Sequence, residues 1–79
     1  MTAIDTTGRH PSTQQIARWF GYGHLPEETP ARKASATCAI TAEKMIANLP
    51  DSPELVAGLR HLLEAKDCFV RAAIAAGET

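Results

Sequence analysis

The chain has 79 residues, a formal net charge of −1 and a hydrophobic share of 44%, and aromatic side chains make up only 5% of the residues. A chain of this length forms a single domain with a thin core, because it buries only about 60% of the surface that the unfolded chain exposes. The near-neutral charge argues against a general binder of nucleic-acid polymers, which needs many simultaneous phosphate contacts, so any anion site must be local.

Residues 1–10 are polar and follow no period, so we expect a flexible leader followed by a single helical domain over 11–79. The leader lacks the basic start and apolar run of a secretory signal. No stretch of the chain approaches the ~20 apolar residues that span a bilayer. We therefore expect the protein to remain in the cytoplasm where it is made, with no membrane partner.

A short helix is predicted over about 12–20, because a proline and a serine at its start are typical of a helix N-terminus. Ile16, Trp19 and Phe20 recur at spacings of three and four and form one apolar stripe. We interpret Trp19 and Phe20 as core residues that continue this stripe. Gly21 then ends the helix.

A second helix is predicted over about 30–49, because Thr29 and Pro30 suit its cap and first position. The apolar positions of this helix advance by four, three, four and four residues, close to a single seam. That seam comprises Ala34, Cys38, Thr41, Met45 and Leu49. Ile40 and Ile46 lie off it.

The sequence PDSPE ends the second helix and begins a third, predicted over about 53–76, with Asp51 or Ser52 as its cap. Because the connection is short, the two long helices must run antiparallel. The third helix has an apolar face that is too wide for one partner helix. That face comprises Leu55, Leu59, Leu62, Lys66, Phe69 and Ala73, widened by Val56, Leu63, Val70 and Ile74. A monomer cannot bury this face together with Ile40 and Ile46, so we predict an all-α homo-oligomer.

The sequence offers no evident catalytic or metal-binding set. The three histidines are scattered, and no zinc-ligand spacing, Rossmann glycine loop or P-loop occurs. Cys38 and Cys68 are not spaced as in a disulfide framework, so we interpret them as reduced, packed thiols. We expect no enzyme activity, no metal and no cofactor.

Residues 18–35, RWFGYGHLPEETPARKAS, combine three aromatic side chains with three basic ones just before the second helix. The first amides of a helix that begins at Pro30 have no acceptor within the helix, and Arg32 and Lys33 add full charges there. Ser35, one turn into the helix, offers a hydroxyl that can reach a phosphate oxygen. These features predict a local anion site.

Two interpretations of the aromatic residue in the connector stay open. In one, Tyr22 lies between glycines and lays its ring over a nucleotide base, which contributes on the order of 1–3 kcal/mol, and His24 touches the same ligand. In the other, the aromatic rings close the open end of the helix pair while Arg32 and Lys33 form ion pairs with the two glutamates before them. A two-fold axis in an oligomer would place two copies of Tyr22 and Lys33 on one symmetric ligand, such as a cyclic dinucleotide.

The order WFGYGHLP, then RKAS at a helix start, then LPDSPELVAGLRHLLEAKDCFVRAAIA resembles the small phage anti-CBASS sponge proteins. These proteins sequester the cyclic oligonucleotide signals of bacterial CBASS immunity, and the resemblance covers about residues 12–76. It implies a compact all-helical homo-oligomer, typically a hexamer, in the host cytoplasm. It also implies that cyclic dinucleotides such as cGAMP bind at one class of site between protomers and cyclic trinucleotides at another, without cleavage.

For the dinucleotide site, the resemblance implies that Tyr22 is the stacking tyrosine and Lys33 the phosphate-binding lysine, with Arg32 and His24 beside them. Ser35 matches the hydroxyl residue two positions after that lysine. The connector between Tyr22 and Lys33 is shorter here than in the family, which affects the expected ligand preference more than the fold.

For the trinucleotide site, the resemblance implies Arg71 together with Ser35 and Gly23. The register of the third helix also leaves Arg60 possible, and Gly23 stands where the family can have a polar residue.

Two other functions remain open on the sequence. The chain can be a helical protein-interaction module, such as a phage adaptor or inhibitor that binds a host protein through its exposed apolar stripe. It can also be an enzyme that acts on cyclic nucleotides, although no general base or metal set is evident.

Overall fold

The computed structural model describes residues 4–22 and 29–77. Of these residues, 79% are helical and none is in a strand, so the predicted all-α class is confirmed. The elements are α1 (Pro11–Ala17), the 3-10 helix η1 (Arg18–Phe20), α2 (Pro30–Asn48) and α3 (Pro53–Gly77). No helix in the described ranges is both long and apolar enough to cross a membrane.

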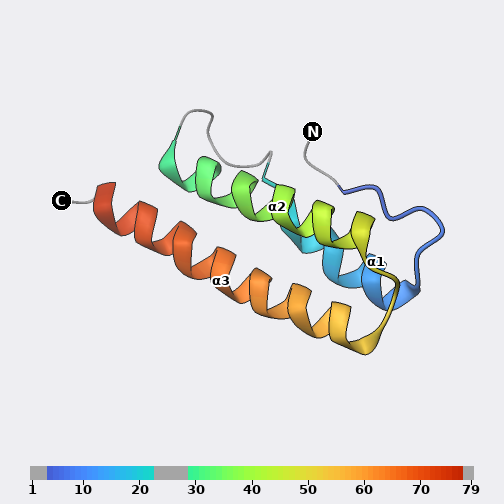
Figure 1. The fold of residues 1–79 in the computed structure, drawn as a ribbon. Helices are drawn as coiled ribbons and strands as arrows, with labels where there is room; N and C mark the ends of the chain where they lie inside the picture. Colours follow the sequence, from blue (N-terminus) through green and yellow to red (C-terminus); the bar gives the residue numbers. More distant parts are fainter. Residues whose placement is uncertain (1–3, 23–28, 78–79) are drawn as a thin grey trace.

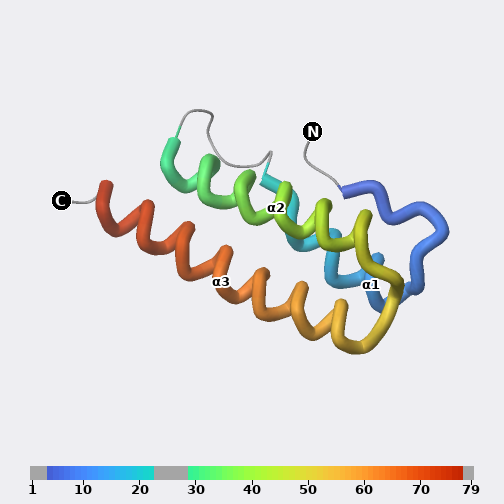
Figure 2. Tube along the Cα trace, in the orientation of Figure 1, coloured from blue at the N-terminus to red at the C-terminus, as the bar shows by residue number. Residues whose placement is uncertain are grey.

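The long helices α2 and α3 lie side by side and run in opposite directions, joined by residues 49–52 (Figures 1 and 2). Helix α1 packs on α3, and η1 packs on α2. Both short elements cover the part of the helix pair nearest the connecting turn (Figure 1). Of the described elements, only the two long helices extend to the opposite end, where α2 begins and α3 finishes, and the molecule has extents of 43 × 22 × 17 Å.

Each helix begins at a proline that follows a capping side chain. The Arg32 amide donates to Thr29 Oγ1 at 3.2 Å, and the Leu55 amide donates to Ser52 Oγ at 3.0 Å. His10 takes the same role at α1, where its Nδ1 accepts from the Ser12 amide at 3.0 Å. Ser52 is therefore the cap of α3, and these caps explain why the helices begin where the sequence indicated.

Asp51, the other cap candidate, instead binds the segment before α1. Its carboxylate accepts from Arg9 Nε at 3.1 Å, from the His10 amide at 3.0 Å and from Thr13 Oγ1 at 2.7 Å. The Arg9 guanidinium also donates to the carbonyls of Ile46 and Leu49 at the end of α2. Two residues of the expected flexible leader, Arg9 and His10, thus bind the turn between the long helices.

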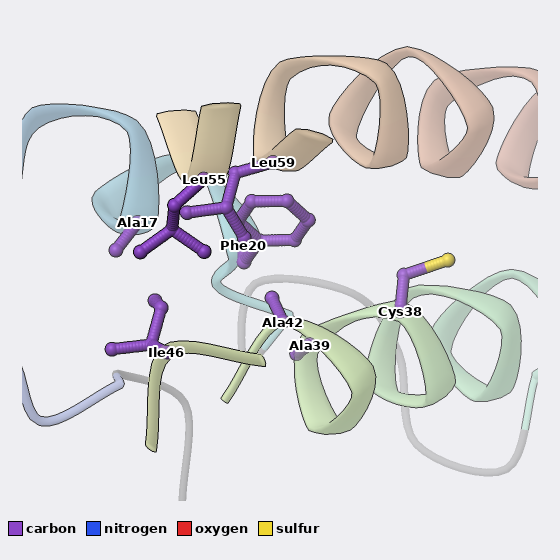
Figure 3. Packing of buried hydrophobic residues seen from close by; sticks show 8 residues of the cluster. All are labelled: Ala17, Phe20, Cys38, Ala39, Ala42, Ile46, Leu55 and Leu59. Atoms are coloured by element: carbon purple, nitrogen blue, oxygen red, sulfur yellow. The ribbon is translucent and has the colours of Figure 1, made fainter. Parts of the chain in front are cut away.

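The core forms where η1 meets both long helices. Phe20 is fully buried and lies between Leu59 of α3 and Ala42 of α2 (Figure 3). Alanines at the α2 contact allow the ring to approach the helix backbone closely. The buried apolar residues are Ala17, Phe20, Cys38, Ala39, Ala42, Ile46, Leu55 and Leu59.

The buried face of α2 differs from the predicted seam. Met45 and Leu49 are exposed, whereas Ile46, which was expected off the seam, is only 3% exposed. The seam was predicted for one partner helix, but α2 packs on both α3 and η1, so its buried face is centred differently. The buried residues of α2 are Ser35, Cys38, Ala39, Ala42 and Ile46.

Trp19 also departs from the prediction that it is a core residue. Its side chain is 56% exposed, and the Arg18 guanidinium lies over its ring, 4.8 Å from the centroid. The buried positions of this segment are Thr13, Ala17 and Phe20, which recur at four and three residues. Trp19 lies to one side of that line, so only the neighbouring Phe20 enters the core.

Candidate functional site

Tyr22 is placed beside the first turn of α2. Its side chain is half-buried and packs against the core cluster. The Arg32 guanidinium lies over its ring, with Cζ 5.6 Å from the ring centroid, a distance typical of a cation–π contact. The structure thus joins two of the predicted site residues, one from the segment after η1 and one from α2.

The backbone of this first turn is more fully bonded than the sequence suggested. The Arg32 amide is capped by Thr29 Oγ1, and the Lys33 amide donates to the Thr29 carbonyl at 3.1 Å. Of the three amides expected to be open, that of Ala31 alone has no acceptor among the described residues. The positive charge available to an anion therefore comes mainly from side chains.

Lys33 is the exposed cation of this turn. Within residues 4–22 and 29–77 its ammonium has no ion-pair or hydrogen-bond partner, while its carbonyl accepts from Thr37 Oγ1 at 2.9 Å. An unpaired, solvated lysine next to a tyrosine–arginine pair leaves one full positive charge available to an incoming anion.

Ser35 lies in the interior and not on this surface. Its side chain is 1% exposed, and its Oγ has no hydrogen-bond partner among the described residues. Cys38, one turn further along α2, is buried as well. A ligand at the exposed Lys33 would not contact the buried Ser35 hydroxyl in this conformation.

Arg71 lies on the surface of α3, where its Nη2 contacts the sulfur of exposed Cys68 at 3.3 Å. The C-terminal end of α3 and the start of α2 lie at the same end of the molecule (Figure 1). Within one protomer, however, exposed Arg71 and buried Ser35 do not form one binding surface. Gly23 and His24, the remaining predicted site residues, lie outside the described residues.

Lys66 has a role that sequence reasoning missed. Its side chain is only 9% exposed, and its Nζ donates to the Trp19 carbonyl at 2.8 Å. This bond ties η1, and so the segment that leads to Tyr22, to α3. The signal was the position of Lys66 among the leucines of the apolar stripe, where a cation needs a buried acceptor.

Both cysteines are free thiols, but Cys38 is buried and Cys68 is exposed, so only Cys38 is packed as expected. Burial raises the pKa of the Cys38 thiol, and the nearby charge of Lys66 opposes this rise. Among the described residues, no three histidine, cysteine or acidic side chains come together as metal ligands.

Comparison with known proteins finds no matching family model, no similar curated protein and no similar solved structure. The geometry of the described residues is therefore what bears on function.

Proposed function

We propose that the protein is a phage immune-evasion protein that binds and sequesters cyclic oligonucleotide signals in the host cytoplasm, without cleaving them. The single observation that carries this proposal is the contact of the Arg32 guanidinium with the Tyr22 ring at the start of α2, where the next residue, Lys33, is exposed. It combines an aromatic ring with two cations that are neighbours in the chain, whereas the chain as a whole is close to neutral. Those are the groups that a base and a phosphate require.

In this proposal a base stacks on Tyr22, and Arg32 and Lys33 hold the phosphates. Arg32 already lies against the ring, so it can keep the tyrosine in place beside the phosphate. Arg71 provides the cation of a second pocket for cyclic trinucleotides, completed by another protomer. Ser35 does not contact the ligand in this proposal, because its side chain is buried.

Assembly into a homo-oligomer, with a hexamer as in the resembling family, is part of the same proposal. Its support is the amount of apolar surface that a single chain leaves exposed along the two long helices. The large hydrophobic residues exposed there are Ile40, Met45, Leu49, Phe69 and Ile74. A two-fold axis would bring two Tyr22–Lys33 surfaces onto one cyclic dinucleotide.

The test is a thermal-shift screen of the purified protein with cyclic dinucleotides, cyclic trinucleotides and linear dinucleotides. A ligand that binds only the folded state raises Tm in proportion to the logarithm of its concentration over Kd. We expect rises with cyclic ligands alone. Ligand recovered intact after denaturation would separate a binding protein from an enzyme that acts on it.

The variants Tyr22→Ala and Lys33→Ala test whether these two residues bind the cyclic dinucleotide. Each should weaken cyclic dinucleotide binding about tenfold or more, because each removes a stacking or charge-assisted contact. Lys44→Ala is the matched control, since Lys44 is also an exposed lysine of α2. Unchanged affinity in both site variants, with wild-type folding, would contradict the assignment.

A second candidate is a protein-interaction module, favoured by an apolar groove between α2 and α3 near their connecting turn. The groove has a volume of about 260 Å³ and Glu54 is its one charged lining residue. The other lining residues are Met45, Leu49, Leu55, Gly58, Leu59 and Leu62. In this case no nucleotide would shift Tm, and a pull-down would be the next experiment.

A further inference from the structure

Two adjoining depressions lie where α1 and η1 meet α3, on the part of the molecule near the connecting turn. Their volumes are about 470 and 420 Å³, within the usual range of about 300–1,000 Å³ for small-molecule sites. They share Ser12, Val56 and Arg60. We call the combined depression the α1–α3 groove.

One half of the groove combines an aromatic ring and aliphatic side chains with polar residues such as Gln15. Ile16 and Trp19, from α1 and η1, face Val56 of α3 across it. Trp19 is 56% exposed although it is the largest side chain in the protein, and Arg18 lies over its ring. An exposed indole beside aliphatic side chains is a ready surface for a planar ring.

The cation of the groove is Arg60, which lines both halves. In the described part of the chain, its guanidinium has no hydrogen-bond or ion-pair partner. Asp51 is the one carboxylate in the lining, and its oxygens already accept from Arg9, His10 and Thr13. An anion at Arg60 would therefore not face an unpaired carboxylate.

The other half of the groove is mostly apolar and also contains small polar groups. Ser12 and Ser52 contribute hydroxyls, and the exposed His10 contributes a ring whose Nδ1 already accepts from the Ser12 amide. The floor beneath them is formed by Pro53, Val56 and Ala57. The groove thus offers an exposed indole, a guanidinium without a partner among the described residues, and two serine hydroxyls.

We propose that the α1–α3 groove is a second ligand site, for a planar aromatic ring that carries one anionic group and a hydroxylated linker, as a nucleoside monophosphate does. The ring lies against Trp19, the anion binds Arg60, and the linker reaches the serine hydroxyls. The groove contains neither Tyr22 nor Lys33, so this site does not depend on the function proposed above.

Trp19 is the only tryptophan of the chain, so its fluorescence reports directly on this groove. The probe is adenosine 5′-monophosphate, titrated while Trp19 emission is recorded, and adenosine is the uncharged comparison. We expect a saturable change with the monophosphate and an affinity for adenosine lower by about tenfold or more, because the charged hydrogen bond to Arg60 is lost.

Three variants localise the effect. Arg60→Gln should lower the affinity for the monophosphate to that of adenosine, while Lys44→Gln and Lys33→Ala should leave it unchanged. The Tm of each variant verifies folding, and Arg60 is exposed, so its replacement is tolerated. Any one of three results would overturn the proposal: no saturable change, equal affinity for the two probes, or unchanged affinity in folded Arg60→Gln. Loss of binding in Lys33→Ala would also overturn the proposal, because the monophosphate would then bind at Tyr22 and Lys33 and not in the groove.

Discussion

At the residue scale, Ser35 shows how burial changes the meaning of a predicted ligand residue. The serine was assigned to both nucleotide sites because it follows Lys33 by two positions, yet in a helix such a spacing turns the side chain to another face. Its Oγ is buried without a hydrogen-bond partner in the described chain, a condition that costs free energy on folding.

We therefore predict that Ser35→Ala raises the free energy of unfolding by about 1 kcal/mol, because it removes an unsatisfied buried hydroxyl. Chemical denaturation measures this as a higher midpoint with an unchanged slope. The same variant should bind cyclic trinucleotides as the wild type does. Destabilisation together with weakened binding would mean that the hydroxyl serves a ligand or a partner protomer.

At the scale of the elements, the caps were predictable and the buried faces were only partly so. Thr29 and Ser52, each followed by proline, are local signals, and the helices begin where those signals stand. The faces of α2 and η1 depend on which elements pack against them, and no local signal carries that information. Met45 and Trp19 were therefore placed in the core although they are exposed.

In the candidate site, too, the local signals were predictable and the packing between elements was not. That Tyr22 and Arg32 lie close together was predictable, because the second helix starts soon after the connector. That Arg32 lies over the Tyr22 ring depends on how η1 docks, and this docking uses the buried Lys66 on a distant part of the chain. A lysine in an apolar stripe indicates some buried acceptor but not which one.

The bonds between Asp51 in the connecting turn and the segment around Arg9 make the free energy of unfolding depend on pH. The pKa of the Asp51 carboxyl is below its ordinary value of 3.8, first because Thr13 Oγ1 donates to it and next because the His10 amide does, with Arg9 adding to both. A lowered folded pKa favours the ionised form in the native state. Its contribution to stability is thus fully present above about pH 4 and is lost as pH falls through the folded value.

We therefore expect the free energy of unfolding to decrease on acidification below the ordinary carboxyl range, and Asp51→Asn to remove part of that decrease. Denaturant midpoints measured from neutral to strongly acidic pH verify this. The variant should be less stable than the wild type at neutral pH and should approach it in acid. A constant difference at all pH values would contradict the role of the ionised carboxylate.

At the scale of the whole molecule, the notable property is an elongated pair of helices covered along only part of its length. Apolar side chains such as Ile40, Phe69 and Ile74 remain exposed, each by about half of its surface. We predict that light scattering at micromolar concentration gives a mass that is a multiple of the chain's 8.5 kDa. A mass equal to that of one chain would contradict assembly, and with it any site shared between protomers.

The contacts of Arg9 have a consequence for the order of folding. They join residues that are 37 to 42 positions apart in the chain, whereas α2 and α3 are neighbours across a short turn. Closing the larger loop costs more chain entropy, and its bonds can form only when the end of α2 and the turn already exist. We therefore expect the helical hairpin to assemble first and the segment around Arg9 to dock last. The turn between the long helices would then be fixed by a segment that adds no helix to the hairpin and forms its bonds only after the hairpin exists.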